Sequence, residues 1–144
     1  MNTYCRGVEV NELTKHFVDT YVARFGETPT YNSGTYDAII YGLAPSIEEA
    51  GTIDSDKVVS ILENRVYKSP AGTVKYTKTK SGKHRHDLTW GPGYLTGLGV
   101  QWQDGKMVGV WPYKWKPDKD SPEVTHKGIV PIKIPPCLIE KYKK

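Results

Sequence analysis

The segment from residue 31 to residue 36 is the part of the sequence best suited to bind a small ligand. It reads Tyr-Asn-Ser-Gly-Thr-Tyr, so it is rich in aromatic and hydroxyl side chains, and it leads directly into a predicted helix. The free backbone N–H groups and the dipole at a helix N-terminus favour an anionic or zwitterionic ligand such as a carboxylate. A capped turn with packed tyrosines explains the same residues equally well, and the chemistry alone leaves both interpretations open.

The other reactive side chains form no recognisable catalytic or metal-binding pattern. His84 and His86 lie on the same side of an extended segment, but no third ligand follows at a zinc-binding spacing. The glycines of Gly91-Pro92-Gly93 do not open a helix, as a dinucleotide-binding motif requires. We therefore expect no enzymatic activity, no bound metal and no cofactor, and we interpret the histidines as solvated loop residues.

The two cysteines, Cys5 and Cys137, lie near opposite ends of the chain. They are either two free thiols or, in an exported protein, an end-to-end disulfide, and the sequence does not decide between these possibilities. A nucleophilic role for Cys5 has little support, because we expect the N-terminal residues to be frayed.

One amphipathic helix is predicted before the 31–36 segment, and a second begins within this segment. The first runs from Asn11, a suitable N-cap, to Phe25, and Gly26 is suited to end it. The second begins at residue 33 or 35 and ends at residue 50. Pro45 falls within it, so we expect either a kink or a restart with Pro45 in the first turn.

A shorter third helix is predicted from about residue 54 to residue 63, with Asp54 or Ser55 as its cap. The three helices share apolar side chains at three- and four-residue spacing, which predicts one apolar face on each. These positions are Leu13, Phe17, Val18, Tyr21, Val22 and Phe25 in the first, Tyr36, Ile40, Leu43 and Ile47 in the second, and Val58, Val59 and Leu62, expected to be buried, in the third.

The second half of the sequence changes from helical spacing to the alternation typical of strands. Residues 73–77 predict a half-buried strand, and Ser81-Gly82 predicts a turn in the polar stretch that follows. Residues 98–103 and 106–111 flank Asp104-Gly105, a dipeptide that favours a two-residue type I′ hairpin turn. From residue 112 onward six prolines interrupt regular structure, and we predict an extended tail that wraps the body or is partly disordered.

The composition, 38% hydrophobic and 25% charged over 144 residues, is typical of one soluble globular domain. The net charge of +4 lies in the tail, because residues 112–144 contain eight lysines and four acidic residues, which leaves twelve basic and twelve acidic residues before them. A neutral body argues against a nucleic-acid partner. The N-terminus lacks the features of a signal peptide, so we expect a cytoplasmic chain or a mature or truncated one.

Six short motifs follow one another along the chain, at residues 17–21, 23–29, 36–51, 55–63, 71–76 and 99–106. Their order resembles that of the branched-chain amino-acid-binding family of type I periplasmic binding proteins. The resemblance covers roughly residues 12–112.

The resemblance implies an α/β fold that is part of a type I periplasmic-binding-protein lobe, with three helices, then antiparallel strands and a hairpin. The partial domain would comprise residues 1–111, followed by the extended, proline-rich basic tail 112–144. The implied function is that of a periplasmic or extracytoplasmic solute-binding component of an ABC importer for branched-chain amino acids or similar small carboxylates, with the importer's permease as its partner. Most of the lobe structure would lie outside this sequence, so we expect exposed apolar faces and self-association.

The resemblance also implies ligand-binding residues. Tyr31 matches a position where family members place an aromatic ring against the ligand side chain, and Asn32 and Ser33 lie near the binding cleft. Tyr36 is a fourth candidate with a structural alternative, and Asp37 is expected in the favourable first turn of its helix. Two other functions stay open: the ligand-sensing domain of a signalling protein, and a stand-alone small α+β interaction protein.

Overall fold

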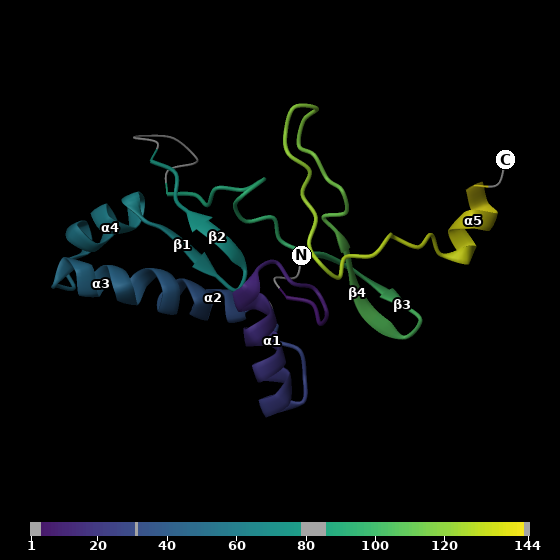
Figure 1. Ribbon diagram of the computed structural model, residues 1–144, viewed down its shortest axis with the longest axis horizontal. Helices are drawn as coiled ribbons and strands as arrows, with labels where there is room; N and C mark the ends of the chain where they lie inside the picture. The colour runs from purple at the N-terminus through teal and green to yellow at the C-terminus, as the bar shows by residue number, and fades with distance from the viewer. Residues whose placement is uncertain (1–3, 31, 79–85, 143–144) are drawn as a thin grey trace.

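A computed structural model of the chain describes residues 4–30, 32–78 and 86–142, and shows a mixed α/β structure with two small antiparallel sheets. Helices α2 to α4 and the β1–β2 hairpin lie on one side, while the β3–β4 hairpin and the tail lie on the other (Figure 1). The elements are α1 (Glu12–Phe25), α2 (Ser33–Asp37), the π-helical turn η1 (Ala38–Leu43), α3 (Ala44–Ala50), α4 (Ser55–Asn64), β1 (Val66–Ser69), β2 (Gly72–Lys75), β3 (Gly99–Gln103), β4 (Lys106–Trp111) and α5 (Pro136–Tyr142).

Helix α1 begins and ends as the sequence predicts. The Asn11 side chain accepts hydrogen bonds from the backbone N–H groups of Leu13 and Thr14, while the Thr14 hydroxyl accepts one from the Asn11 N–H. This reciprocal pair satisfies N–H groups that a helix leaves unpaired at its start. Gly26 ends the helix in the left-handed conformation at φ 76°, where glycine carries no steric penalty.

The second predicted helix is continuous from residue 33 to residue 50, through α2, η1 and α3. Pro45 lies in the first turn of α3, the position predicted for it, although the backbone stays helical before it rather than breaking and restarting. The preceding turn is widened, so that the Ala44 N–H donates to the Ile39 carbonyl five residues back. The buried side of this helix consists of Gly42, Ser46 and the carboxylate-bearing Asp37 rather than of large apolar residues.

The apolar face predicted for this helix is directed largely to solvent. Tyr36 is 66% exposed, Ile40 60% and Leu43 38%, and Ile39 is exposed beside them. We call these four residues the helix stripe. The helix instead packs through Gly42, where an added Cβ would come within 2.6 Å of the Tyr67 hydroxyl on β1.

Helix α4 is capped by Asp54, whose carboxylate accepts a hydrogen bond from the Lys57 N–H at 3.1 Å. Val58 is buried as predicted, but the predicted burial of Val59 is wrong, since that side chain is 39% exposed. Neighbouring helix positions differ by about 100° around the axis, so a helix that packs along one line buries only one of the two valines.

The predicted strand at residues 73–77 is β2, which is shorter and pairs with β1, a strand that the sequence analysis missed. The register places Val66 opposite Lys75 and Ser69 opposite Gly72. β1 is only four residues long and its apolar residues do not alternate clearly, so its pairing with β2 is what makes it a strand. The predicted turn at Ser81-Gly82 lies outside the described residues.

The β3–β4 hairpin confirms the strongest local prediction. Asp104 and Gly105 adopt φ values of 52° and 74°, as a type I′ turn requires. Behind the hairpin a small core contains Cys5, Val8 and Leu98, with Val10, Val100 and Ile129 packed against it. The expectation of a frayed N-terminus is therefore wrong from residue 4 onward, because the hairpin and the tail bury this segment.

The first part of the tail runs along the body, and its end extends away from the body. Lys127 pairs with Glu9 in an isolated antiparallel bridge, and the Val130 N–H donates to the Gly109 carbonyl at 2.9 Å. Beyond these contacts the chain forms α5, a short helix that the sequence analysis did not predict. In the part of the chain that the structure describes, no helix combines the length and apolar character needed to cross a bilayer.

The close contact between the tail and the N-terminal segment yields a stability prediction. Gly128 has φ 87°, and a Cβ at this position would overlap the Gly7 carbonyl oxygen. We expect Gly128→Ala to lower the free energy of unfolding in urea by about 2–4 kcal/mol, because backbone strain and a backbone clash act together.

Gly93→Ala is the matched control for this variant. Gly93 has φ 81°, but an added Cβ meets no atom within 4 Å. Strain alone is expected to cost about 1 kcal/mol there. Equal losses in the two variants would contradict a tightly packed contact at Gly128.

Candidate functional site

The structure brings three of the four candidate ligand-binding residues to one end of the 33–50 helix. Asn32 is exposed in the turn before the helix, Ser33 is half-buried at its first position, and Tyr36 is exposed one turn later. The Ser33 N–H donates to the Thr30 carbonyl at 3.1 Å, which fixes the turn. Tyr31 lies outside the described residues.

This end of the helix has the chemistry of a small anion site open to solvent. The amides of a first helical turn have no partners within the helix, although the Ser33 N–H is already engaged by the Thr30 carbonyl, and the helix dipole adds positive potential there. Asn32 and Ser33 supply neutral hydrogen-bonding groups, and Tyr36 supplies an aromatic surface. The arrangement is suited to a carboxylate attached to an apolar group.

A buried acid lies directly behind this surface. Asp37 is 5% exposed and accepts a hydrogen bond from the hydroxyl of Tyr4, which is also buried. Burial raises the pKa of Asp37, while the Tyr4 hydroxyl and the Ala71 N–H oppose that rise by stabilising the carboxylate. Burial, with the hydrogen bond to Asp37, also raises the pKa of Tyr4.

The expected role of Asp37 in the first turn of the helix is therefore wrong. The helix begins at Ser33, so Asp37 lies at the end of α2, beyond the first turn. Its carboxylate instead joins the helix to the N-terminal segment through Tyr4. Tyr4 had no local signal in the sequence, because only the fold brings residues 33 positions apart together.

A hollow of about 300 Å³ lies elsewhere, between the β1–β2 hairpin, the loop at residues 92–96 and the tail at residues 122–126. Thr96 lies at its wall, nearly buried, and its hydroxyl is 3.0 Å from Nε2 of His126. Burial lowers the pKa of His126, so this imidazole favours its neutral form.

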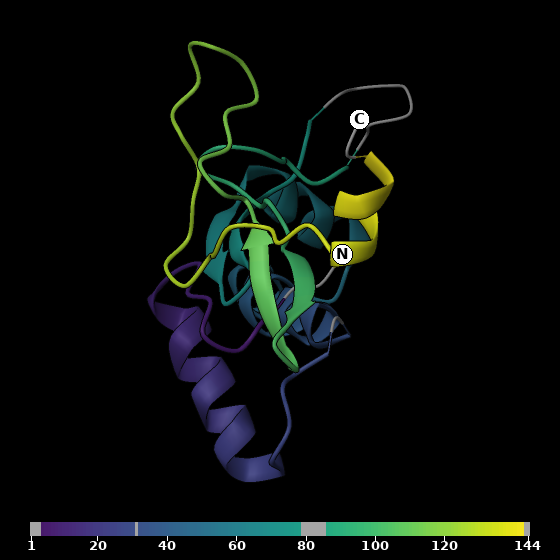
Figure 2. The same cartoon turned by 90° about the vertical axis from the view of Figure 1, so that its right-hand side faces the viewer.

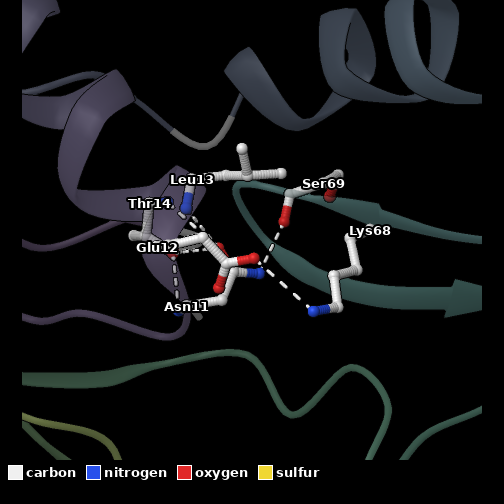
Figure 3. A network of polar contacts seen from close by, with 6 residues as sticks. All are labelled: Asn11, Glu12, Leu13, Thr14, Lys68 and Ser69. Atoms are coloured by element: carbon white, nitrogen blue, oxygen red, sulfur yellow. Dashed lines mark hydrogen bonds and ion pairs between the residues drawn. The ribbon is translucent and has the colours of Figure 1, made fainter.

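The wall of this hollow formed by α1 and β1 is a structural junction (Figure 3). The Asn11 side-chain N–H donates to the Ser69 carbonyl at 2.9 Å while its oxygen caps α1, and the Thr14 hydroxyl donates to the Pro70 carbonyl at 2.6 Å. Lys68 lies 3.5 Å from Glu12, and both side chains are well exposed. These contacts hold α1 to the β1–β2 turn and occupy the polar groups of this wall.

The remaining reactive side chains are dispersed. His86 contacts Glu63 on α4, whereas His84 lies outside the described residues. Within residues 4–30, 32–78 and 86–142, no three histidine, cysteine or acidic side chains gather as metal ligands would. Both cysteines are free thiols: Cys5 is buried, which raises its pKa, and Cys137 is exposed.

Comparison with models of known protein families gives no match for this chain. Comparison with curated proteins gives none either.

The Tyr4–Asp37 pair makes stability depend on pH. The folded pKa of Asp37 lies above its ordinary value of 3.8, so between these two values the folded state retains a proton that the unfolded state has lost. The free energy of unfolding should therefore fall as pH rises through this window, and Asp37→Asn should remove that decrease. Urea unfolding of the wild type and of Asp37→Asn at a series of pH values measures the decrease and its removal.

Tyr4→Phe tests the hydrogen bond itself. Without the hydroxyl, the buried carboxylate loses a donor, and we expect a loss of about 1–3 kcal/mol at neutral pH. Tyr113→Phe is the control, because Tyr113 is an exposed tyrosine. An unchanged stability of Tyr4→Phe would show that the pair contributes nothing to the fold.

His126 should make stability depend on pH in the sense opposite to Asp37, so that stability falls as pH falls. Its folded pKa lies below the ordinary value of 6.5, so the unfolded state binds the proton first as pH falls. Wild-type stability should decline as pH falls from 6.5 through the lowered folded value, and His126→Gln should remove this decline. Identical profiles for wild type and His126→Gln would contradict this assignment.

Proposed function

We propose that this chain is part of the α/β lobe of a type I periplasmic binding protein. It serves as the extracytoplasmic solute-binding component of an ABC importer and delivers a branched-chain amino acid or a similar small carboxylate to the permease. Its role is to bind and release the ligand without chemical change.

The order of the observed elements supports the proposal. A helix that ends at Gly26 is followed by a loop and by a second helix that ends at Gly51. Helix α4, strand β2 and the closing hairpin around Asp104-Gly105 come next. These are the elements, in sequence order, on which the resemblance to the family rests.

The observation that carries the proposal is the exposure of the helix stripe beside the candidate loop. Tyr36, Ile39, Ile40 and Leu43 form an apolar surface on one helix. In α/β lobes such a surface packs against a sheet, because a helix is stable in water only when its apolar side is covered. The stripe is thus the surface expected of a lobe completed by further strands, and it is also the surface through which the isolated chain would self-associate.

The proposed class of ligand is based on the chemical groups in the loop at residues 31–36. The first helical turn offers N–H groups and a positive dipole to a carboxylate, and Asn32 and Ser33 lie beside it. Tyr36, and Tyr31 by the resemblance, offer aromatic surface to an aliphatic side chain. A small amino acid carries both kinds of group.

The test is ligand-dependent thermal stabilisation of the complete product of the open reading frame that contains this sequence. The panel comprises leucine, isoleucine, valine and small organic acids. A ligand that binds only the folded state at 100 times its Kd adds about 2.7 kcal/mol of stability, which is a clear shift in Tm. We expect at least one of the branched-chain amino acids or small acids to give such a shift.

Substitutions distinguish effects on ligand binding from effects on the stability of the fold. Tyr31→Ala and Ser33→Ala should reduce the ligand-induced shift while preserving the Tm of the free protein, and Tyr113→Ala, an exposed tyrosine on the tail, should change neither. If no compound in the panel shifts the Tm, the transport function is contradicted. A monomeric chain with a sharp two-state melt and no ligand response would favour a small interaction protein instead.

A further inference from the structure

The end of the tail projects from the body as a separate arm. We define the arm as residues 131–142, which comprise an extended segment and α5. Figure 1 shows α5 displaced from the rest of the fold, beyond the β3–β4 hairpin, and in Figure 2 the yellow α5 lies to one side of the green hairpin. Each residue from 131 to 141 is exposed, so the arm adds almost nothing to the core of this chain.

The base of the arm is held by its backbone and by the Lys133 side chain rather than by its apolar side chains. The Gln101 side-chain amide donates to the Lys133 carbonyl at 2.7 Å and accepts from the Lys133 N–H at 2.9 Å. Gln103 donates to the Pro131 carbonyl at 3.0 Å. The Lys133 ammonium lies 2.6 Å from the Asp104 carboxylate at the tip of the hairpin. This clamp orients the arm and leaves its apolar side chains unused.

Those apolar side chains are turned to water. Ile132 and Ile134 are 68% and 63% exposed on either side of the clamped Lys133, and Leu138 and Ile139 are exposed on α5. Prolines at positions 131, 135 and 136 restrict the backbone, so the arm loses little conformational freedom when it binds. Four large aliphatic residues on a pre-ordered arm constitute a binding surface.

The arm and the two lysines that follow it in the sequence, Lys143 and Lys144, carry nearly all of the net charge. Residues 131–144 contain four lysines and one glutamate, a charge of +3, whereas the whole chain has a charge of +4. The preceding residues are therefore close to neutral. The concentration of positive charge around exposed aliphatic residues determines which partner the arm is suited to.

We propose that the arm binds an anionic lipid surface. Lysines are attracted to acidic headgroups, while aliphatic side chains enter the boundary between headgroups and acyl chains. Short basic segments with few apolar residues bind such surfaces reversibly. This inference rests on the arm alone and is independent of the proposed ligand.

A second copy of the chain is a weaker candidate for the same arm. The helix stripe is apolar, but of the three acidic residues on its helix Asp37 is buried and Glu49 pairs with Arg65 at 2.6 Å. Only Glu48 is left to attract the lysines of the arm. A membrane surface with many acidic headgroups provides the complementary charge that this helix lacks.

The experiment is co-sedimentation of the full chain with vesicles. Vesicles of phosphatidylcholine mixed with phosphatidylglycerol are compared with vesicles of phosphatidylcholine alone, at low and at high salt. We expect binding to the anionic vesicles, little binding to the neutral ones, and a marked decrease at high salt because salt screens exposed charges.

Two pairs of variants assign the binding to the arm and to the two lysines that follow it. Leu138→Ser with Ile139→Ser should abolish sedimentation with anionic vesicles, and Ile53→Ser, an 85% exposed isoleucine outside the arm, should not. Lys143→Gln with Lys144→Gln should weaken binding by roughly 10- to 30-fold. Lys116→Gln with Lys119→Gln changes the net charge equally at exposed positions before the arm, and should have a much smaller effect.

Unchanged thermal melts of the arm variants, expected because residues 131–141 are exposed, exclude misfolding as the cause of lost binding. Three results would overturn the proposal. They are the absence of binding to anionic vesicles, equal binding to both kinds of vesicle, and concentration-dependent self-association that the arm variants abolish, which would identify a second copy as the partner.

Discussion

Burial of Cys5 and Val8 against Leu98 holds the two sides of this molecule together. The N-terminal segment lies between the helices on one side and the β3–β4 hairpin on the other, and Ile129 of the tail closes over it. The contact depends on two glycines, because a Cβ at Gly109 would lie 2.6 Å from the Val8 side chain, and Gly128 passes directly over Gly7. With so small a core, each of these contacts represents a substantial part of the stability that a chain of this size can have.

The candidate site depends on that same segment. Tyr4 precedes the core residues and donates its hydroxyl to Asp37, so the helix that carries the loop is fixed to the N-terminal segment by a buried polar pair. A buried carboxylate is tolerated only when its oxygens are hydrogen-bonded. The orientation of the first helical turn, and hence of any anion bound there, is thereby linked to the packing of the core.

Two surfaces of the fold remain apolar and uncovered, and they differ in the partner they suit. The helix stripe is a broad face on a helix whose charged residues are buried, paired or few, as expected for a surface that packs inside a larger α/β lobe. The arm is narrow, basic and clamped by its backbone to Gln101. The first surface is suited to permanent burial and the second to a reversible contact.

The sequence by itself determined the elements that short-range chemistry specifies. Asn11 and Gly26 define the ends of α1 because capping satisfies local backbone groups, and Asp104-Gly105 defines the β3–β4 turn because its two residues tolerate positive φ. The position of Pro45 in a first turn is equally local, because proline lacks the N–H that the helix interior requires.

Only the tertiary structure decided what each element touches. Helical spacing identified three residues of the stripe, Tyr36, Ile40 and Leu43, but not their exposure. Neither the pairing of β1 with β2 nor the partnership of Tyr4 with Asp37 has a local signal. The physical reason is that burial is a property of contacts between distant segments, whereas caps and turns depend on neighbouring residues. The sequence therefore determined where α1 to α4 and the main hairpin lie, and the fold determined which of their faces are covered and which are left for a partner.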